Sequence, residues 1–343
     1  MSELRKRRNT GKVTLADVAK QAGVGTMTVS RVLRTPDAVS DKLRDKVQRA
    51  VEQLGYIPNK AAGALASAQS YAIALIIPSL LEKACALFLP RFQQRLNKAG
   101  YQLLLGYSDY SVQQEEDLLA GFLESRPAAV VLFGNEHTQR THQLLEMANA
   151  PVLEIAESPS MNSYASMGSD PHDIGKRCTS HLVSQGFHHI GFIGARGNHA
   201  TLQRKLQGWQ GAMIEHYLTP DHFLTTHEAP SAQLGAEGLA KLLLRDATLD
   251  ALVCSHEEIA IGALFECHRR VLKVPTDIAI ISLEGTSMSE HAFPSLTSAE
   301  IDYQSLGVQA ASAILQAIEG QPLTGAQTIP FKLAHRASTA RKN

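Results

Sequence analysis

From residue 71 onward, short apolar runs alternate with amphipathic segments of helical period, and this alternation constrains the fold more than any other feature. The runs YAIALIIP (71–78) and YQLLLGYS (101–108) have the length of buried strands, and a segment of helical period lies between them at 84–98. Strands that alternate with helices at this spacing form parallel sheets covered by helices. The cycle continues to residue 284, which gives more strands than one such sheet usually holds. We therefore predict an α/β core of two lobes.

A core of this kind is expected to bind a small molecule. Ligands of such folds bind outside the carboxyl ends of the parallel strands, and a cleft between two lobes is a common binding place. We expect no catalytic residue, metal or cofactor, because there is no phosphate-binding glycine loop, no GxSxG elbow and no CxxC spacing among the four cysteines. No apolar run approaches the ~20 residues of a membrane span, and the N-terminus is too polar for a signal peptide. We expect a cytoplasmic protein without a membrane partner.

Residues 14–33, TLADVAKQAGVGTMTVSRVL, indicate two short helices joined by a tight turn at 22–24. Gly23 can adopt the left-handed backbone angle that such a turn needs. Apolar residues at helical spacing would form a small core, and they are Leu15, Val18, Ala19, Val29, Val32 and Leu33. The pattern is typical of a helix-turn-helix, whose second helix enters the major groove of DNA.

A third helix is expected at 41–54, with Ser40 as its N-cap and Gly55 at its end, which completes an all-α head over residues 1–58. Residues 59–70, NKAAGALASAQS, are small and weakly apolar. They form either a flexible linker or a hinge helix that orders on DNA, where an apolar side chain would act as a minor-groove wedge.

Charge separates the head from the rest of the chain. Residues 1–60 hold 13 Lys+Arg and 6 Asp+Glu, whereas the other residues hold 20 and 27. A basic head gains affinity for a duplex through counterion release, so the division favours DNA binding over an enzyme that happens to contain two such helices. The run at 5–8, RKRR, is either an arm that adds non-specific affinity or a solvated tail.

Seven segments in order resemble the lactose-repressor/galactose-repressor family of bacterial transcriptional regulators: VTLADVAKQAGV, MTVSRVL, LGYIPN, LIIPSL, HHIGFIG, LKVPTDIAI and PSLTS. The resemblance implies a helix-turn-helix head, a hinge helix at 59–70, a two-lobed periplasmic-binding-protein-like core at 71–343, and a homodimer on a palindromic operator. It places the first lobe at about 71–160 and 292–320 and the second at about 161–291 and 321–340. The crossings between the lobes are then expected near 157–168, 286–292 and 320.

Within the family, MTVSRVLRTPDAVSDKLRDKV, GNEHTQRT and FECHRRVLKVP are similar to the gluconate and idonate utilisation repressors. The likeness implies that Thr26 and Met27 discriminate bases and that Arg31 binds guanine, a contact worth roughly 1–3 kcal/mol of discrimination. Phosphate and hinge contacts complete the predicted DNA-binding set: Thr14, Thr28, Ser30, Asn59, Ala62 and Leu65.

The cleft departs from the pattern of neutral-sugar members at three positions. Lys205 stands in place of an Arg, His256 in place of an Asn, and Glu284 in place of an Asp. Lys is cationic and His becomes so near neutral pH, so both would hold a carboxylate, while Glu284 would accept hydrogen bonds from hydroxyls. We predict that these three residues, with Ser79 from the first lobe, bind a sugar or a sugar acid such as gluconate, another aldonate or a uronate.

Each cleft residue also has a purely structural interpretation. Lys205 would then be a solvated helix residue, His256 a helix cap, and Glu284 an ion-pair partner between the lobes.

Two other functions are weighed against a sugar-acid-controlled repressor. One is a solute-binding protein without a DNA role, which the basic head argues against. The other is a sugar-acid enzyme that uses His256, Glu257 and Glu258 as an acid-base or metal cluster, although no second ligand set lies at metal spacing. The sequence leaves open whether the effector releases the operator or promotes its binding.

Overall fold

The computed structural model describes residues 13–57, 70–155, 164–197, 199–323 and 325–341. These belong to two compact units, Met1–Tyr71 and Ala72–Asn343. The expected hinge at 59–70 lies outside the described residues except for Ser70. None of the described helices is long and apolar enough to cross a membrane.

The head consists of helices around a small apolar core. They are α1 (Leu15–Gln21), α2 (Thr26–Arg34), the 3-10 turn η1 (Pro36–Ala38) and α3 (Asp41–Leu54). Gly23 and Gly55 adopt the left-handed backbone angles (φ +58° and +63°) that end α1 and α3. Ser40 occupies the N-cap of α3 as predicted, although in the described head its side chain makes no capping hydrogen bond.

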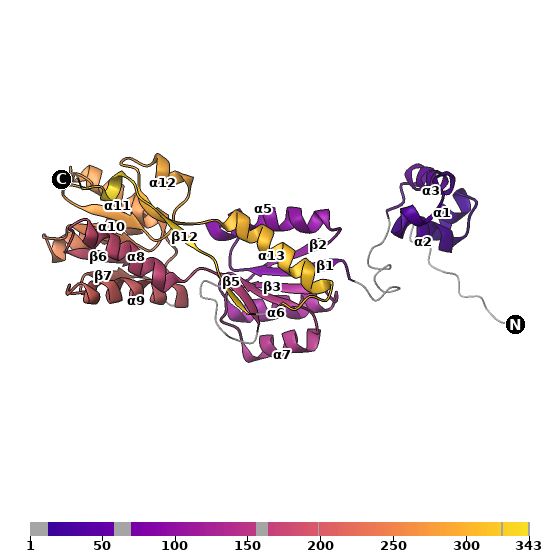
Figure 1. Cartoon of the computed structure of the whole chain (residues 1–343), viewed down its shortest axis with the longest axis horizontal. Coiled ribbons are helices and arrows are strands. Elements are labelled where there is room, and N and C mark those ends of the chain that lie inside the picture. Colours follow the sequence, from indigo (N-terminus) through magenta and orange to yellow (C-terminus); the bar gives the residue numbers. More distant parts are fainter. Residues whose placement is uncertain (1–12, 58–69, 156–163, 198, 324, 342–343) are drawn as a thin grey trace. The chain divides into compact units, whose positions relative to one another are not determined.

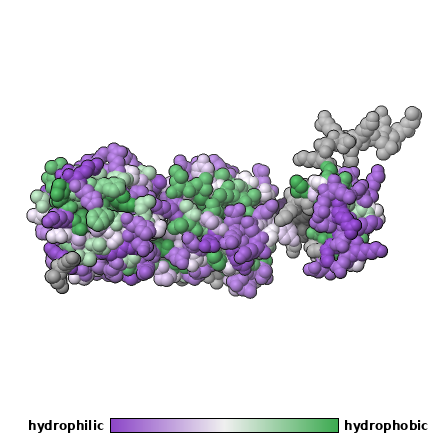
Figure 2. All heavy atoms as spheres, turned by 90° about the horizontal axis from the view of Figure 1, so that it is seen from above, coloured by the Kyte–Doolittle hydropathy of each residue, from purple (hydrophilic) through white to green (hydrophobic). Residues whose placement is uncertain are grey.

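Seven buried side chains hold the three helices of the head together: Val18, Ala19, Ala22, Val29, Val32, Val47 and Ala50. They recur at three- and four-residue spacing, so each helix turns one apolar stripe inward. The opposite faces carry charged and polar residues, and the visible face of the head is mostly hydrophilic (Figure 2).

The first lobe of the core contains a six-stranded parallel sheet in its described part. The strands are, in sheet order, β11 (Ala326–Thr328), β5 (Ala165–Gly168), β4 (Val152–Ile155), β3 (Ala129–Phe133), β1 (Ala72–Ile77) and β2 (Gln102–Tyr107). Its helices are α5 (Lys83–Lys98), α6 (Val112–Leu123), α7 (Gln139–Ala148) and α13 (Tyr303–Ile318).

Both faces of this sheet are buried at its central strands β1 and β3, which explains why these two strands are continuously apolar. Ile73, Leu75 and Ile77 of β1 pack against α5 and α13, which lie side by side (Figure 1). Ala74 and Ile76 point the other way, toward the cluster that α6 and α7 complete. The side chains alternate between the faces because successive residues of a strand point in opposite directions.

The second lobe contains a six-stranded sheet that is parallel except at one edge, where β12 runs antiparallel to β10. The strands are, in sheet order, β12 (Phe331–Ala334), β10 (Thr297–Ile301), β9 (Ala279–Ser282), β8 (Ala251–Cys254), β6 (Ile190–Gly194) and β7 (Phe223–Thr225). Its helices are α8 (Pro171–Ser184), α9 (Ala200–Glu215), α10 (Ala232–Arg245), α11 (Glu257–Arg269) and α12 (Ser287–His291), with the 3-10 turn η2 (Ala337–Thr339).

Sheet pairing places the crossings between the lobes later than predicted. Strands β5 and β11 pair in the first-lobe sheet, whereas β10 pairs in the second-lobe sheet. The chain therefore crosses at 169–170, at Asp302 and at 329–330, and the lobe boundaries predicted at 160, 292 and 320 are wrong. Short motifs do not show which sheet a strand joins, and the hydrogen-bond ladder decides it.

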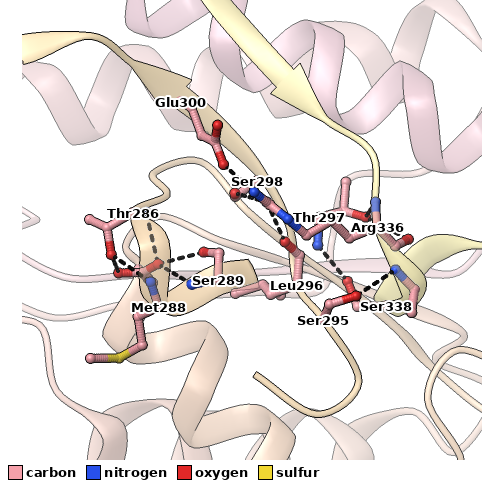
Figure 3. A network of polar contacts seen from close by, with 12 residues as sticks. Thr286, Met288, Ser289, Ser295, Leu296, Thr297, Ser298, Glu300, Arg336 and Ser338 are labelled. Carbon is pink, nitrogen blue, oxygen red and sulfur yellow. Dashed lines mark hydrogen bonds and ion pairs between the residues drawn. The ribbon is translucent and has the colours of Figure 1, made fainter. Parts of the chain in front are cut away.

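Two of the crossings are joined to each other. The Ser169 hydroxyl donates to the carbonyl oxygen of Ile329 at 2.9 Å, and the Ile329 N–H donates to the carbonyl oxygen of Gly168 at 2.7 Å. After β12, Arg336 donates to Leu296 and forms an ion pair with Glu300 (Figure 3). The bonds of Ser169 and Ile329 fix two of the segments that connect the lobes, and those of Arg336 fasten the segment after β12 within the second lobe.

Candidate functional site

The exposed face of α2 carries four of the five DNA contacts that are predicted on this helix. Successive residues of a helix are about 100° apart, so Thr26, Met27, Ser30 and Arg31 share one face. Thr26, Met27 and Arg31 are exposed, Met27 by 79%, and Ser30 is half-buried. Thr28 is also half-buried and lies off this face. The structure thus brings four of these five residues together on a surface that can meet base edges.

Thr14 forms the N-cap of α1. Its hydroxyl donates to Asp17 Oδ2 at 2.7 Å and accepts from the Asp17 N–H at 3.4 Å. The bond from the hydroxyl, together with one from the Thr14 N–H to the same carboxylate, lowers the pKa of Asp17. A phosphate contact through the hydroxyl proton would have to replace its bond to Asp17. The other predicted DNA contacts, Asn59, Ala62 and Leu65, lie outside the described residues.

A pocket of about 200 Å³ lies between the two lobes of the core. Its second-lobe wall is built where the neighbouring strands β6, β8 and β9 end, at Arg196, His256 and Glu284. Its first-lobe wall includes Ser108 and Asn135, which follow β2 and β3. The carboxyl ends of both sheets therefore border one pocket, as expected for this kind of fold.

Lys205 is buried because α9 packs closely against α8. A side chain at Gly208 would place its Cβ 2.1 Å from the carbonyl oxygen of His172, so only glycine permits this approach. Lys205, only 3% exposed, lies 3.2 Å from the Ser255 carbonyl oxygen and forms an ion pair with Glu284. Lys205 is therefore not a solvated helix residue, and its pairing with Glu284 lies within the second lobe rather than between the lobes.

His256 occupies the N-cap position of α11, but its side chain faces the pocket. Nδ1 lies 2.7 Å from the Ser255 hydroxyl, and Nε2 lies 3.8 Å from Glu284 Oε1. Burial, together with the charge of Lys205, lowers the pKa of His256 to about 3. The expectation of a cationic histidine near neutral pH is therefore wrong. His256 is a neutral hydrogen-bonding group there, because a buried charge beside a lysine is unfavourable.

Comparison with known proteins identifies the family of this chain. Residues 14–59 match the family model of bacterial regulatory proteins of the lacI family, and residues 179–339 match the periplasmic binding protein-like domain. The HTH-type transcriptional regulator GntR of Escherichia coli is 33% identical over 310 residues, which cover 90% of this chain and 93% of that protein. The chain belongs to the LacI family.

Two solved structures extend this likeness. A PurR family transcriptional regulator from Vibrio parahaemolyticus is 73% identical, covers 79% of this chain and 100% of its own, and has a TM-score of 0.77. The Lac repressor dimer bound to operator and the anti-inducer ONPF is 26% identical, with a TM-score of 0.86 over 96% of this chain and 100% of that one. The predicted family is confirmed, and the protein is a DNA-binding transcriptional regulator, not an enzyme.

Ser79 is the one predicted effector residue that does not border the pocket of this LacI-family core in its described part. Its hydroxyl accepts a hydrogen bond from the Leu81 N–H at 3.2 Å, which stabilises the turn before α5. Glu82, three residues later, does border the pocket. We therefore leave Ser79 out of the proposed site.

Sequence reasoning missed a bridge between the lobes. Lys83 Nζ lies 2.6 Å from Glu257 Oε2 and 3.0 Å from Glu258 Oε1. Glu257 is fully buried and also accepts hydrogen bonds from Thr286 and Ser289 at the start of α12. The described residues hold no group of three side chains arranged for a metal ion. Because both carboxylates bind Lys83, they do not form the acid-base cluster with His256 that was considered.

A second buried cluster lies in the first lobe. His137 Nδ1 lies 2.6 Å from Glu115 Oε1, and Nε2 lies 3.4 Å from Glu154 Oε1. Burial alone would lower the pKa of His137, but the two carboxylates outweigh it and raise the pKa to about 9. Glu115 also borders the pocket. A charged histidine thus lies between two buried carboxylates, one of which borders the pocket.

Proposed function

We propose that this regulator represses genes of carbohydrate and sugar-acid catabolism in the cytoplasm, as a homodimer on a palindromic operator. We further propose that gluconate, or a related aldonate or uronate, binds between the lobes and sets operator affinity. The observation that supports this proposal best is that cationic and anionic side chains from the two lobes line one pocket. The cations Arg204 and Lys205 of the second lobe and the carboxylates of Glu82 and Glu115 of the first border the same pocket. A sugar acid offers an anionic end and several hydroxyl donors to such walls.

The operator contacts are proposed from α2 and the hinge. Thr26, Met27 and Arg31 would read base edges, Ser30 and Thr28 would contact phosphates, and Thr14 would do so at the start of α1. Asn59 would contact a phosphate, Leu65 would enter the minor groove, and Ala62 would contact the DNA at the hinge. The likeness to a Lac repressor dimer on its operator supports the dimer. A palindrome follows from the two-fold symmetry of such a dimer, whose two heads bind two half-sites.

Lys205, His256 and Glu284 are the proposed polar contacts of the effector. Because the pocket is bordered by both lobes, a bound ligand stabilises one arrangement of the lobes over another. Operator and effector affinities are then coupled reciprocally, typically by about 1–3 kcal/mol.

Fluorescence anisotropy with a labelled palindromic operator of the gluconate-repressor type tests this function. The full chain is titrated with and without gluconate, uronates and neutral sugars. Tight, salt-sensitive binding that one sugar acid shifts about tenfold, as a coupling of ~1.4 kcal/mol requires, supports the proposal, and the direction of the shift shows whether the ligand induces or corepresses. A response to neutral sugars alone rejects the effector class. If selection from random DNA yields no specific site, the DNA-binding part fails.

A further inference from the structure

Two residues with left-handed backbone angles meet across the pocket. Tyr110 (φ +61°) follows β2 in the first lobe, and Arg196 (φ +55°) follows β6 in the second. The Arg196 guanidinium carbon lies 3.7 Å from the centre of the Tyr110 ring, and both residues border the pocket. This conformation is costly for residues other than glycine and is concentrated at functional sites. The backbone of each lobe is therefore strained at the residue that contributes to this contact, Tyr110 in the first lobe and Arg196 in the second.

The backbone beside Arg196 is held independently of its side chain. The Arg196 N–H donates to the Glu228 carbonyl oxygen at 3.0 Å, and the Gly197 N–H donates to the Thr226 carbonyl oxygen at 2.7 Å. The turn after β6 is thus fastened to the segment that follows β7. A substitution at Arg196 would therefore change the pocket and leave this turn in place.

Tyr110 is held from both sides of the pocket, by Glu82 of the first lobe and His199 of the second. Its hydroxyl donates to Glu82, and its ring meets His199 edge-on, with 5.0 Å between the ring centres. Because the ring is fixed in this way, it provides a firm surface for the guanidinium of Arg196. Stacking occupies the flat face of a guanidinium and leaves its N–H groups, which lie in the plane, free to bind an anion.

The guanidinium of Arg196 still has an unused donor. Its Nε is buried and has no hydrogen-bond partner among the described residues. The Nε of Arg204 is also buried and has no hydrogen-bond partner among the described residues, but Arg204 Nη2 lies 3.0 Å from Asp170. Lys205 is paired with Glu284. Arg196 is therefore the pocket cation whose described contacts are an aromatic ring and backbone rather than a carboxylate.

We infer that Arg196, held by Tyr110, binds the carboxylate of the effector, and that the Lys205–Glu284 pair binds its hydroxyls. This inference rests on the proposed function, and it assigns the selectivity of the pocket for acids to the guanidinium of Arg196. A planar guanidinium edge matches a carboxylate with two parallel hydrogen bonds. The carboxylate would then be bound at a contact to which both lobes contribute, so the ligand charge would favour the arrangement in which Tyr110 and Arg196 meet.

Isothermal titration calorimetry of the full chain tests the assignment with two pairs of ligands, gluconate with glucitol and glucuronate with glucose. Each neutral partner carries a hydroxymethyl group in place of the carboxylate and is otherwise the same. The variants are Arg196→Gln, Tyr110→Leu and Lys205→Gln. The control is Arg177→Gln, because Arg177 also stacks on an aromatic ring, that of Phe331 at 4.3 Å, but does not border the pocket in the described residues. Thermal melting checks that each variant is folded.

The wild-type protein is expected to prefer one acid over its neutral partner, and Arg196→Gln to weaken binding of that acid about 10- to 100-fold, the value of a charge-assisted pair. Binding of the neutral partner should change little, and Tyr110→Leu should have a smaller effect of the same kind. If Lys205→Gln abolishes the preference and Arg196→Gln keeps it, Lys205 is the anchor and only this inference is wrong. If the wild-type protein shows no preference for either acid, the proposed effector class fails as well.

Discussion

Lys83 of the first lobe donates a hydrogen bond of 2.6 Å to the buried carboxylate of Glu257 in the second lobe. Thr286 and Ser289 of the second lobe also donate hydrogen bonds to the Glu257 carboxylate, which fixes its position for the bond with Lys83. Burial alone would raise the pKa of Glu257, but hydrogen bonds from Lys83, Ser289 and Thr286 outweigh it and lower the pKa. Any motion that separates the lobes here must break a bond to a buried charge.

Replacement of Lys83 by Met is expected to lower the free energy of unfolding by about 1–3 kcal/mol, the cost of leaving a buried charged group with fewer donors. The loss stays below that of a fully orphaned charge, because Thr286 and Ser289 still donate to Glu257. Urea denaturation of the full chain measures it. Lys98→Met, at the exposed end of the same helix, is the control, and an equal loss in both variants would show that the bridge contributes nothing.

The charged His137 predicts a loss of stability in alkali. Its pKa is raised from 6.5 to about 9, so the folded state binds its proton more tightly than the unfolded state. This contribution is fully present below pH 6.5 and is lost as the pH rises through about 9. The wild-type protein should lose up to a few kcal/mol over that window, and His137→Gln should lack this slope although it is less stable throughout. Urea denaturation from pH 6 to 9.5 checks it, with exposed His216→Gln as the control that keeps the slope.

His256 predicts the opposite dependence. Its pKa is lowered to about 3, so the unfolded state binds the proton more tightly, and stability falls as the pH drops below 6.5 toward 3. His256→Asn, which cannot be protonated, should lose less stability than the wild-type protein between pH 6.5 and 4. Thermal melting over this range measures the difference. A steeper acid loss in the variant would contradict a neutral His256.

Arg31 is expected to account for discrimination at one guanine of the operator. The wild-type protein should bind the operator more tightly than a version in which that G·C pair is replaced. Arg31→Ala should reduce this difference in binding free energy by about 1–3 kcal/mol. Arg49→Ala also removes one positive charge from an exposed position of the head, and it should weaken binding to both DNAs alike. Anisotropy titrations with both DNAs compare the ratios, and equal ratios for Arg31→Ala and the wild-type protein would remove Arg31 from base reading.

The elements of the head and core could be predicted because their signal is local. The strand expected at 71–78 is β1 (Ala72–Ile77), the helix expected at 84–98 is α5 (Lys83–Lys98), and the turn at Gly23 has its left-handed angle. Apolar periodicity and turn chemistry act over a few residues, so the sequence itself carries them.

The interior of the site could be predicted only in part. Lys205 and Glu284 were both expected in the pocket, but not as partners, because their pairing depends on the close packing of α8 and α9 at Gly208. The neutral state of His256 depends on burial, which no local pattern reveals. Tyr110 and Arg196 meet only because two sheets bring their carboxyl ends to one pocket, so neither residue carried a signal of its own.

The three crossings at 169–170, Asp302 and 329–330 also determine how the core can be divided. Each lobe is assembled from separate stretches of the chain, so no single cut in the polypeptide releases one lobe intact. During translation, synthesis of each lobe therefore begins before the other lobe is complete. The edge strand β11 of the first lobe is synthesised after almost all of the second, so the first sheet can be completed only late in synthesis.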